Sequence, residues 1–563
     1  MKRGLFAVAL ALACAHRPEP APALDFARFA DEFWEEAFAF APSSATAAGV
    51  HQRDGELEDF SRPRLDARVA ALKRSLARLS SFDRSALSFD DRIDARILES
   101  EIRGRLLGLE VVRSWERNPM AYAGVPGNAI DGLMKREFAP AAERLRSAIS
   151  RLEQVPRLYA AGRENLTDPP REFTDLAIRM TRGSIDFFSG PVAEWARLAA
   201  AGDASLLARF DRTNAAAVAA AREFHGWLER DLLPRSTGSY ALGPETFLRK
   251  LAIEELIELP LPELLGRGEA QLAKDRKAFL ETARKIDPSK PAAEVYAALA
   301  DDHPTAEDLL PSVRRSVEAA RQFVVQRRLV EIPSEVRVRI EETPTYDRVG
   351  SFASMDTPGP YESKATEAFY YVTPVEPEWD AKHKEEHLRA FSTYVLAMTN
   401  VHEAYPGHYL QFLYAPSFPT KTRKLSTANS NVEGWAHYAE EMLADQGFGG
   451  GDPRMRLAQL EEALLRDCRY VAGIKLHTAG WSVAQGQQLF VDQCFQEPAN
   501  AFEEARRGTY DPTYLYYTFG KIEIQRMARE YMARKGKTLE QFHGAFLTQG
   551  GFALPLVQEI LFR

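Results

Sequence analysis

Cysteine is scarce in this sequence: three of 563 residues are cysteine, at positions 14, 468 and 494. None lies at metal-ligand spacing from another, so the chain lacks the pattern of a cysteine-ligated metal site. Separation along the chain says nothing about distance in space, so the sequence leaves open whether Cys468 and Cys494 form a disulfide.

Basic excess and long apolar runs are also missing. The net charge is −8, whereas nucleic-acid-binding proteins carry basic stripes, so we expect no nucleic-acid partner. Beyond the N-terminal segment no apolar run approaches the roughly 18 residues that indicate a membrane span. With 45% apolar and 27% charged residues, the composition is typical of a soluble enzyme or binding protein.

The N-terminal segment, residues 1–23, is predicted to be a targeting sequence rather than part of the fold. Two basic residues precede the apolar run from Leu5 to Ala13, which is typical of a signal peptide. Small Ala13 before Cys14 resembles a bacterial lipobox and predicts a lipid anchor at Cys14, in the periplasm or on a bacterial membrane. The alternative is an ordinary signal peptide cleaved near Ala23.

The rest of the chain is predicted to be mostly α-helical. Apolar residues at three- and four-residue spacing continue through residues 24–330, which we interpret as an N-terminal helical lobe. Alternating and aromatic segments within 336–373 predict one small antiparallel β-sheet. Helical patterns return near residue 382, so the sheet and a C-terminal helical lobe make up 331–563.

The segment HEAYPGH is the strongest chemical signal in the sequence. His402 continues an apolar helical stripe, and His408 follows six residues later. On an ideal helix that spacing turns the two rings about 240° apart. Pro406 cannot donate a helical hydrogen bond, and Gly407 tolerates unusual backbone angles. We therefore expect the helix to break there, so that both histidines face one metal ion.

A zinc site needs a third protein ligand, and Glu433 in the segment SNVEGWAHYAEE is the candidate. The alternative is that Glu433 forms a capping box with Ser430. Glu403, next to His402, is predicted to be the base that takes a proton from the attacking water. His437 is interpreted either as a residue that contacts the metal ligands without binding the metal, or as a solvated side chain.

Several blocks resemble the bacterial domain-of-unknown-function family DUF885, many of whose members are lipoproteins. The most specific are HEAYPGHYLQ and EGWAHYAEEM, and looser matches include RYVAGIKLHTAGW and YYTFGKIEIQRM. The family is similar to metallopeptidases of the thimet oligopeptidase, neurolysin and angiotensin-converting-enzyme type. The resemblance implies a two-lobed helical fold with a deep channel and Zn²⁺ held by His402, His408 and Glu433.

Further roles follow from the same resemblance. His477 and Tyr517 match positions of the C-terminal blocks and are candidates to stabilise the charge on the reacting carbonyl oxygen, although Tyr517 also fits an aromatic core stripe. The small sheet is expected to offer an edge strand to a peptide substrate. Apart from the resemblance, the charges of Lys521 and Arg526 make them candidates for contacting a substrate carboxylate; the alternative is that both are solvated.

The leading hypothesis is a zinc-dependent metallopeptidase that hydrolyses short oligopeptides. A second is a zinc amidase that acts on non-peptide or cell-wall amides with the same chemistry. A third is a helical lipoprotein that binds a partner without catalysis.

Overall fold

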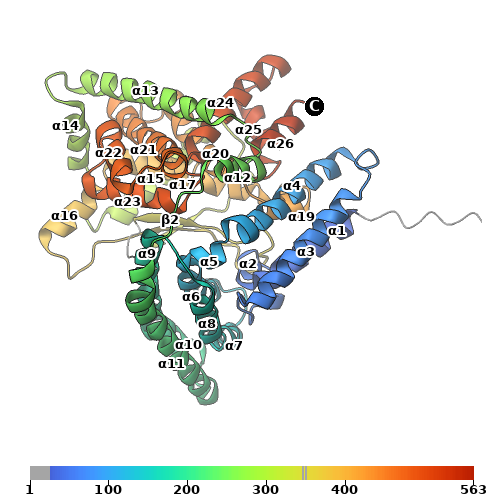
Figure 1. The fold of residues 1–563 in the computed structure, drawn as a ribbon. Helices are drawn as coiled ribbons and strands as arrows, with labels where there is room; N and C mark the ends of the chain where they lie inside the picture. The colour runs from blue at the N-terminus through green and yellow to red at the C-terminus, as the bar shows by residue number, and fades with distance from the viewer. Residues whose placement is uncertain (1–25, 345–347, 349–351) are drawn as a thin grey trace, which may run out of the picture.

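The computed structural model describes residues 26–344, 348 and 352–563. The predicted signal peptide and Cys14 lie outside the described residues. The first part of the chain is helical (Figure 1). Its α-helices are α1 (Phe26–Phe40), α2 (Pro42–Ala47), α3 (Arg62–Ser80), α4 (Phe89–Leu106), α5 (Ser114–Arg117), α6 (Pro119–Met134), α7 (Ala141–Leu152), α8 (Val155–Asn165), α9 (Arg171–Phe187), α10 (Ala193–Ala199), α11 (Ala204–Trp227), α12 (Pro244–Glu254), α13 (Leu261–Ile286), α14 (Ala292–Ala297) and α15 (Leu309–Gln326).

Three short strands follow, and helices then continue to the C-terminus. The strands are β1 (Arg339–Glu342), β2 (Ala353–Asp356) and β3 (Phe369–Val372). The later α-helices are α16 (Ala381–Arg389), α17 (Thr393–Glu403), α18 (His408–Leu413), α19 (Lys421–Leu425), α20 (Asn429–Asp445), α21 (Pro453–Thr478), α22 (Val483–Cys494), α23 (Pro498–Tyr510), α24 (Tyr516–Lys535), α25 (Leu539–Leu547) and α26 (Leu554–Leu561). The prediction of a mostly α-helical chain with one small sheet is confirmed.

Polar side chains set several of the helix boundaries. The Asp203 carboxylate accepts hydrogen bonds from the first backbone N–H groups of α11. Ser482 and Gln485 form a capping box at the start of α22. These side chains satisfy N–H groups that have no partner within the helix, so α11 and α22 begin where the chain supplies such a cap.

The sheet has the order β1–β3–β2. β2 pairs antiparallel with β3, with Met355 opposite Tyr370, but β1 pairs parallel with β3, with Ile340 opposite Tyr370. The predicted antiparallel sheet is therefore wrong in this respect, and the sheet is mixed. Alternation of apolar and polar residues gives the side-chain period of a strand but not the direction of its neighbour.

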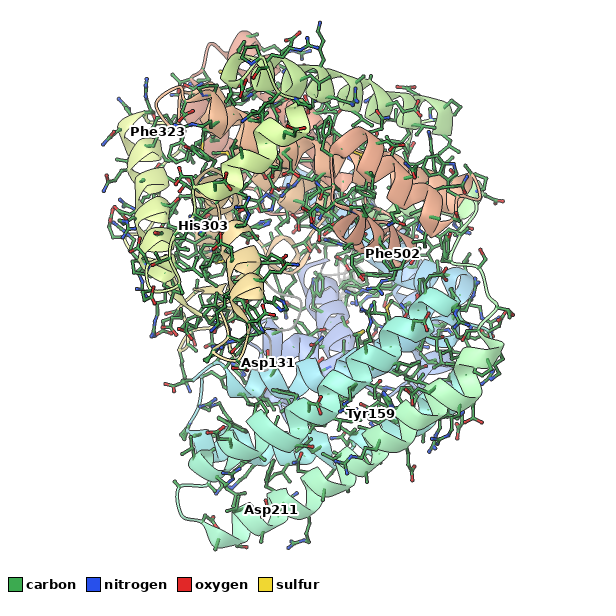
Figure 2. All side chains as sticks on the ribbon, turned by 90° about the vertical axis from the view of Figure 1, so that its left-hand side faces the viewer. Asp131, Tyr159, Asp211, His303, Phe323 and Phe502 are labelled. Atoms are coloured by element: carbon green, nitrogen blue, oxygen red, sulfur yellow. A yellow bond between two sulfur atoms is a disulfide. The ribbon has the colours of Figure 1, made fainter. Side chains whose placement is uncertain are left out.

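Two large apolar cores correspond to the two lobes of the molecule. The lower lobe in Figure 2 contains Tyr159, and its core is formed mainly by α6 to α11. The upper lobe carries Phe323, and its core gathers side chains of α17, α20, α21 and α24. Phe279 of α13 and Val317 of α15 pack into this upper core. The predicted boundary between the lobes at residue 330 stays a prediction.

The structure answers the question about the cysteines. Cys468 of α21 and Cys494 of α22 form a disulfide, with their Cα atoms 6.4 Å apart. Both residues are fully buried, so the bridge ties two adjacent helices of the upper lobe together. Among the described residues, no helix combines the length and the apolar character that crossing a lipid bilayer requires.

Candidate metal centre

The helix that carries His402 ends as predicted before His408. α17 stops at Glu403 and α18 begins at His408. Between them the N–H of Gly407 donates to the carbonyl of Val401 at 3.0 Å, across a wider turn than that of an α-helix. A Cβ atom on Gly407 would lie 1.7 Å from the carbonyl oxygen of His402. The break therefore requires glycine at this position.

α20 holds the break in place from the other side. Its Trp435 is fully buried, and the indole N–H donates to the carbonyl oxygen of Pro406 at 2.7 Å. This bond satisfies a carbonyl that the interrupted helix leaves without a helical partner. The metal-site segment and the helix that carries Glu433 are thus joined directly.

The break brings three potential ligands together. The Nε2 atoms of His402 and His408 each lie 3.5 Å from the same Glu433 carboxylate oxygen. One ligand atom from each of the three residues lies within 4.8 Å of the others. The prediction that both rings converge with this distant carboxylate is confirmed.

Glu433 does not form the alternative capping box. The hydroxyl of Ser430 has no hydrogen-bond partner among the described residues. The start of α20 is capped instead by Glu255, whose carboxylate oxygens accept from the N–H groups of Asn429 at 3.0 Å and Ser430 at 3.1 Å. Glu433 is therefore free to face the two histidines.

A residue that sequence reasoning missed, Glu440, orients His402. Its carboxylate lies 2.6 Å from Nδ1 of His402, 3.3 Å from Nδ1 of His437 and 3.5 Å from the guanidinium of Arg466. Burial disfavours the charged carboxylate, but Arg466 and His437 outweigh it and hold the pKa of Glu440 well below its usual value. The charged Glu440 therefore accepts a hydrogen bond from Nδ1–H of His402, which leaves Nε2 for the cluster.

The two interpretations of His437 can now be separated. Its side chain is fully buried, so it is not a solvated histidine. Burial, followed by the charge of Lys521, lowers the pKa of His437 to about 4. His437 is thus a neutral partner of Glu440, which in turn contacts the ligand His402. The signal in the sequence was its spacing, because His437 and Glu440 lie one and two turns after Glu433 on α20.

The electrostatics of the cluster favour a cation. Burial lowers the pKa of His402, but hydrogen bonds to Glu433 and Glu440 outweigh it and raise this pKa to about 10. The carboxylates thus stabilise positive charge at the ring. Two imidazole nitrogens and one carboxylate oxygen suit a borderline dication such as zinc. The residues present therefore fit the metal that the sequence predicts.

Glu403, His408 and Glu433 line a cavity of about 610 Å³. Strand β2 forms another part of its wall, through residues that include Ser354 and Met355. β2 lies at the edge of the sheet, since only β3 pairs with it among the described strands. The candidate base and an available strand edge therefore meet in one cavity.

Tyr370 of β3 is a second residue that sequence reasoning missed. It lies opposite Met355 in the antiparallel pair, so both side chains project from the same face of the sheet. Burial, together with the charge of Glu403, raises the pKa of Tyr370 well above its usual value. Its buried hydroxyl has no hydrogen-bond partner among the described residues and is free to donate.

The structure does not bring His477 to this cluster. Its ring is buried, and Nε2–H donates to the carbonyl of Gly508 at 2.8 Å. It follows Arg466, the partner of Glu440, by 11 residues on α21, which is about 16 Å along a helix axis. Burial lowers the pKa of His477 to about 4. We therefore give it no part in the chemistry of the cluster.

Tyr517 does not line the cavity that contains Glu403, His408 and Glu433. Its hydroxyl accepts from Arg507 at 3.3 Å, and its ring lies 5.7 Å from the guanidinium of Arg466. Tyr517 is 6% exposed, which agrees with the alternative interpretation of this residue as part of an aromatic stripe in the core. Arg466, which contacts Tyr517, lies 3.5 Å from Glu440, the partner of His402, so the link between Tyr517 and His402 is indirect.

The structure supports neither of the two alternatives for Lys521, a contact with a substrate carboxylate or a solvated charge. Lys521 is fully buried, and its ammonium lies 3.0 Å from Glu441 and 3.4 Å from Asp275. Arg526 is 39% exposed but is paired with Glu523 and Glu530 of its own helix. Neither residue lines the cavity that holds the cluster.

Comparison with known proteins agrees with the fold. The family model described as "Bacterial protein of unknown function (DUF885)" matches residues 42–561. A provisionally assigned lipoprotein of unknown function from Shewanella oneidensis has a similar structure, with a TM-score of 0.81, 27% identity, and coverage of 96% of this chain and 100% of that one. Another, from Colwellia psychrerythraea, shares the fold, with a TM-score of 0.83 at 16% identity over 95% and 98% of the two chains. No curated protein matches significantly. The chain therefore belongs to the DUF885 family of bacterial proteins.

Proposed function

We propose that this protein is a zinc-dependent peptidase that hydrolyses short peptides outside the cytoplasm. The observation that supports this function is the convergence of His402, His408 and Glu433, whose ligand atoms lie within 4.8 Å of one another. Glu403 shares a cavity with His408 and Glu433. The buried carboxylate of Glu440 accepts a hydrogen bond from Nδ1–H of His402. Metal-binding histidines ordinarily have a hydrogen-bond acceptor of this kind on the ring nitrogen that does not bind the metal.

His402, His408 and Glu433 would hold zinc, which would supply a Lewis acid for the scissile carbonyl and for the attacking water. Glu403 accepts the proton of the attacking water and then donates it to the nitrogen of the leaving amine. Glu440 keeps the His402 ring in one orientation throughout. The charge of Glu403 acts on Tyr370, whose hydroxyl is unpartnered among the described residues and is available to donate to Glu403.

The cavity suits an extended chain. The free edge of β2 offers backbone N–H and C=O groups to a peptide that lies alongside it as an additional strand. A volume of about 610 Å³ is in the range of small-molecule sites, so short peptides fit and folded proteins do not. This supports oligopeptides as the substrate class.

We also propose that the protein is exported and anchored by a lipid at Cys14. The lipobox-like sequence around Cys14 supports this location. Two structural neighbours provisionally assigned as lipoproteins agree with it. A peptide substrate would then be met in the periplasm or at the membrane surface.

The decisive experiment combines elemental analysis with the variant Glu403→Gln. We expect about one zinc per chain in both proteins, and a loss of peptide hydrolysis of about 10²- to 10⁴-fold in the variant. The matched control is Glu153→Gln, because Glu153 is 45% exposed and pairs with Arg209 in the lower lobe. This control should keep both zinc and activity.

Other results would favour the alternative functions. Turnover of amides but of no peptide in a mixed panel would favour the zinc amidase. Protein purified without stoichiometric metal, and inactive after zinc is added, would favour a binding lipoprotein. Full activity of Glu403→Gln would remove Glu403 as the base.

A further inference from the structure

The short helix α19 carries basic side chains next to the cavity, and two of them are neutralised by other helices. Lys421 contacts carboxylates of α1, and Arg423, which is 2% exposed, contacts carboxylates of α4. The pairs are Lys421 with Asp31 at 3.3 Å and Glu35 at 3.4 Å, and Arg423 with Asp90 at 2.8 Å and Asp94 at 2.9 Å. These two residues tie α19 to the N-terminal helices.

Lys424 differs from its neighbours. It is half-buried, and no carboxylate lies within ion-pair distance of it in the part of the chain that the structure describes. Its contact is with the face of Tyr361, whose ring centroid lies 6.0 Å from Nζ. Lys424 also lines the cavity that contains Glu403, His408 and Glu433.

The other charged groups of this cavity already have partners or roles. Arg423 is committed to Asp94, Glu433 faces the two histidines, and Glu403 is the proposed base. A half-buried ammonium has lost part of its hydration, and an anionic ligand restores that loss through charge-assisted hydrogen bonds. Lys424 is therefore the group of this cavity that an incoming anion would meet.

We propose that Lys424 binds a carboxylate of the substrate and so selects peptides that present one at a fixed distance from the scissile bond. The proposal rests on the proposed function, because it assigns the substrate class of the same cavity. The carboxylate has two sources in a peptide: the C-terminus, or an aspartate or glutamate side chain. The first source would make the enzyme trim peptides from their C-terminal end.

Binding to the zinc-loaded Glu403→Gln protein tests the proposal without requiring turnover. The probes are N-acetylated tetra-alanine with a free C-terminus, the same peptide as its C-terminal amide, and the amide with one alanine replaced by aspartate. By calorimetry we expect at least one carboxylate peptide to bind about 10- to 100-fold more tightly than the plain amide. Preference for the free acid identifies the C-terminus, and preference for the aspartate peptide identifies a side chain.

Adding Lys424→Met should abolish this preference and leave the affinity for the plain amide unchanged. The matched control is Lys421→Met on the same helix. Because Lys421 is already paired with a carboxylate of α1, this variant should keep the preference for carboxylate peptides. Lys424→Glu should disfavour the carboxylate peptides. Zinc content and thermal unfolding of each variant establish that the fold is kept.

Equal affinity for all three probes, or a preference that survives Lys424→Met, would overturn the proposal. Failure of the proposed function looks different. In that case the protein with Glu403 intact hydrolyses no peptide, whereas carboxylate-selective binding that depends on Lys424 persists.

Discussion

Gly434 of α20 and Gly520 of α24 lie against each other with no side chain between them. A Cβ atom on Gly434 would lie 2.6 Å from the Cα of Gly520, and one on Gly520 would lie 1.9 Å from the carbonyl oxygen of Ser430. The two helices therefore touch backbone to backbone. This contact fixes the turn of α20 that carries Glu433, next to Gly434, and explains the glycine in both the EGW and FGK segments.

Gly520→Ala should separate these helices and weaken both the fold and the site. Its methyl group overlaps a backbone atom that cannot rotate away, so we expect a loss of about 3 kcal/mol in stability and a lower zinc occupancy. Thermal unfolding and metal analysis measure the two effects. Gly544→Ala in α25 is the control, because no atom lies within 4 Å of its Cβ position, and it should be neutral or stabilising. Equal unfolding temperatures for both variants would contradict the close approach.

Gly407→Ala should affect the metal centre more than the overall fold. The added Cβ would lie 1.7 Å from the carbonyl oxygen of His402, so the turn between α17 and α18 must open and move His408 away. We expect far-ultraviolet circular dichroism close to that of the parent, with less than stoichiometric zinc. A variant that keeps one tightly bound zinc would show that the turn is not needed to assemble the ligands.

Local sequence predicted the break after α17 because Pro406 cannot donate a helical hydrogen bond and Gly407 allows backbone angles outside the helical region. It did not reveal Glu440, because a carboxylate on a helix is ordinarily solvated. The role of Glu440 appears only when α21 places Arg466 beside it. For His477 the sequence suggested a role at the metal cluster, but the structure does not bring this residue there. Its position in a sequence block says nothing about how far along α21 it lies from the cluster.

The sheet and the disulfide show the same limit at the level of the fold. The strands of the sheet were recognisable, but their pairing depends on the path of the chain between them. The bridge between Cys468 and Cys494 depends on α21 and α22 lying side by side, with Cα atoms 6.4 Å apart. Periodicity describes one element at a time, and these features belong to pairs of elements.

Glu440→Gln should weaken metal binding without removing a ligand. The amide cannot provide the charged acceptor for Nδ1 of His402, so the ring loses its fixed orientation and basicity. We expect a 10- to 100-fold lower zinc affinity, measured by competition with a chelator of known affinity. Glu153→Gln in the lower lobe serves again as the control. An unchanged affinity would mean that Glu440 supports the fold rather than the metal.

Replacing both Cys468 and Cys494 by serine should lower stability and leave the cluster in place. The bridge closes a segment with a sequence separation of 26, for which chain entropy gives about 3.5 kcal/mol. Thermal unfolding with and without reductant measures this, and reductant should affect only the parent protein. Two free thiols found by mass spectrometry in exported protein would contradict the bridge.

Glu255→Gln should change how stability depends on pH. Burial of Glu255, opposed by hydrogen bonds from Ser430 and Asn429, raises its pKa from 4.5 to about 7. An acid with a raised pKa in the folded state holds its proton where the unfolded chain has released it. Stability from this group is therefore greatest below about pH 4.5 and is lost as the pH rises to about 7, by about 3 kcal/mol in total.

Glutamine at position 255 cannot titrate, so the difference in unfolding free energy between the two proteins isolates this group. We expect the parent to lose stability relative to the variant between pH 5 and 7. Both proteins must be measured in chelator, because zinc binding also depends on pH. A difference that stays constant with pH would mean that the carboxylate is already charged at pH 5. In that case the N–H groups of Asn429 and Ser430 outweigh the cost of burial.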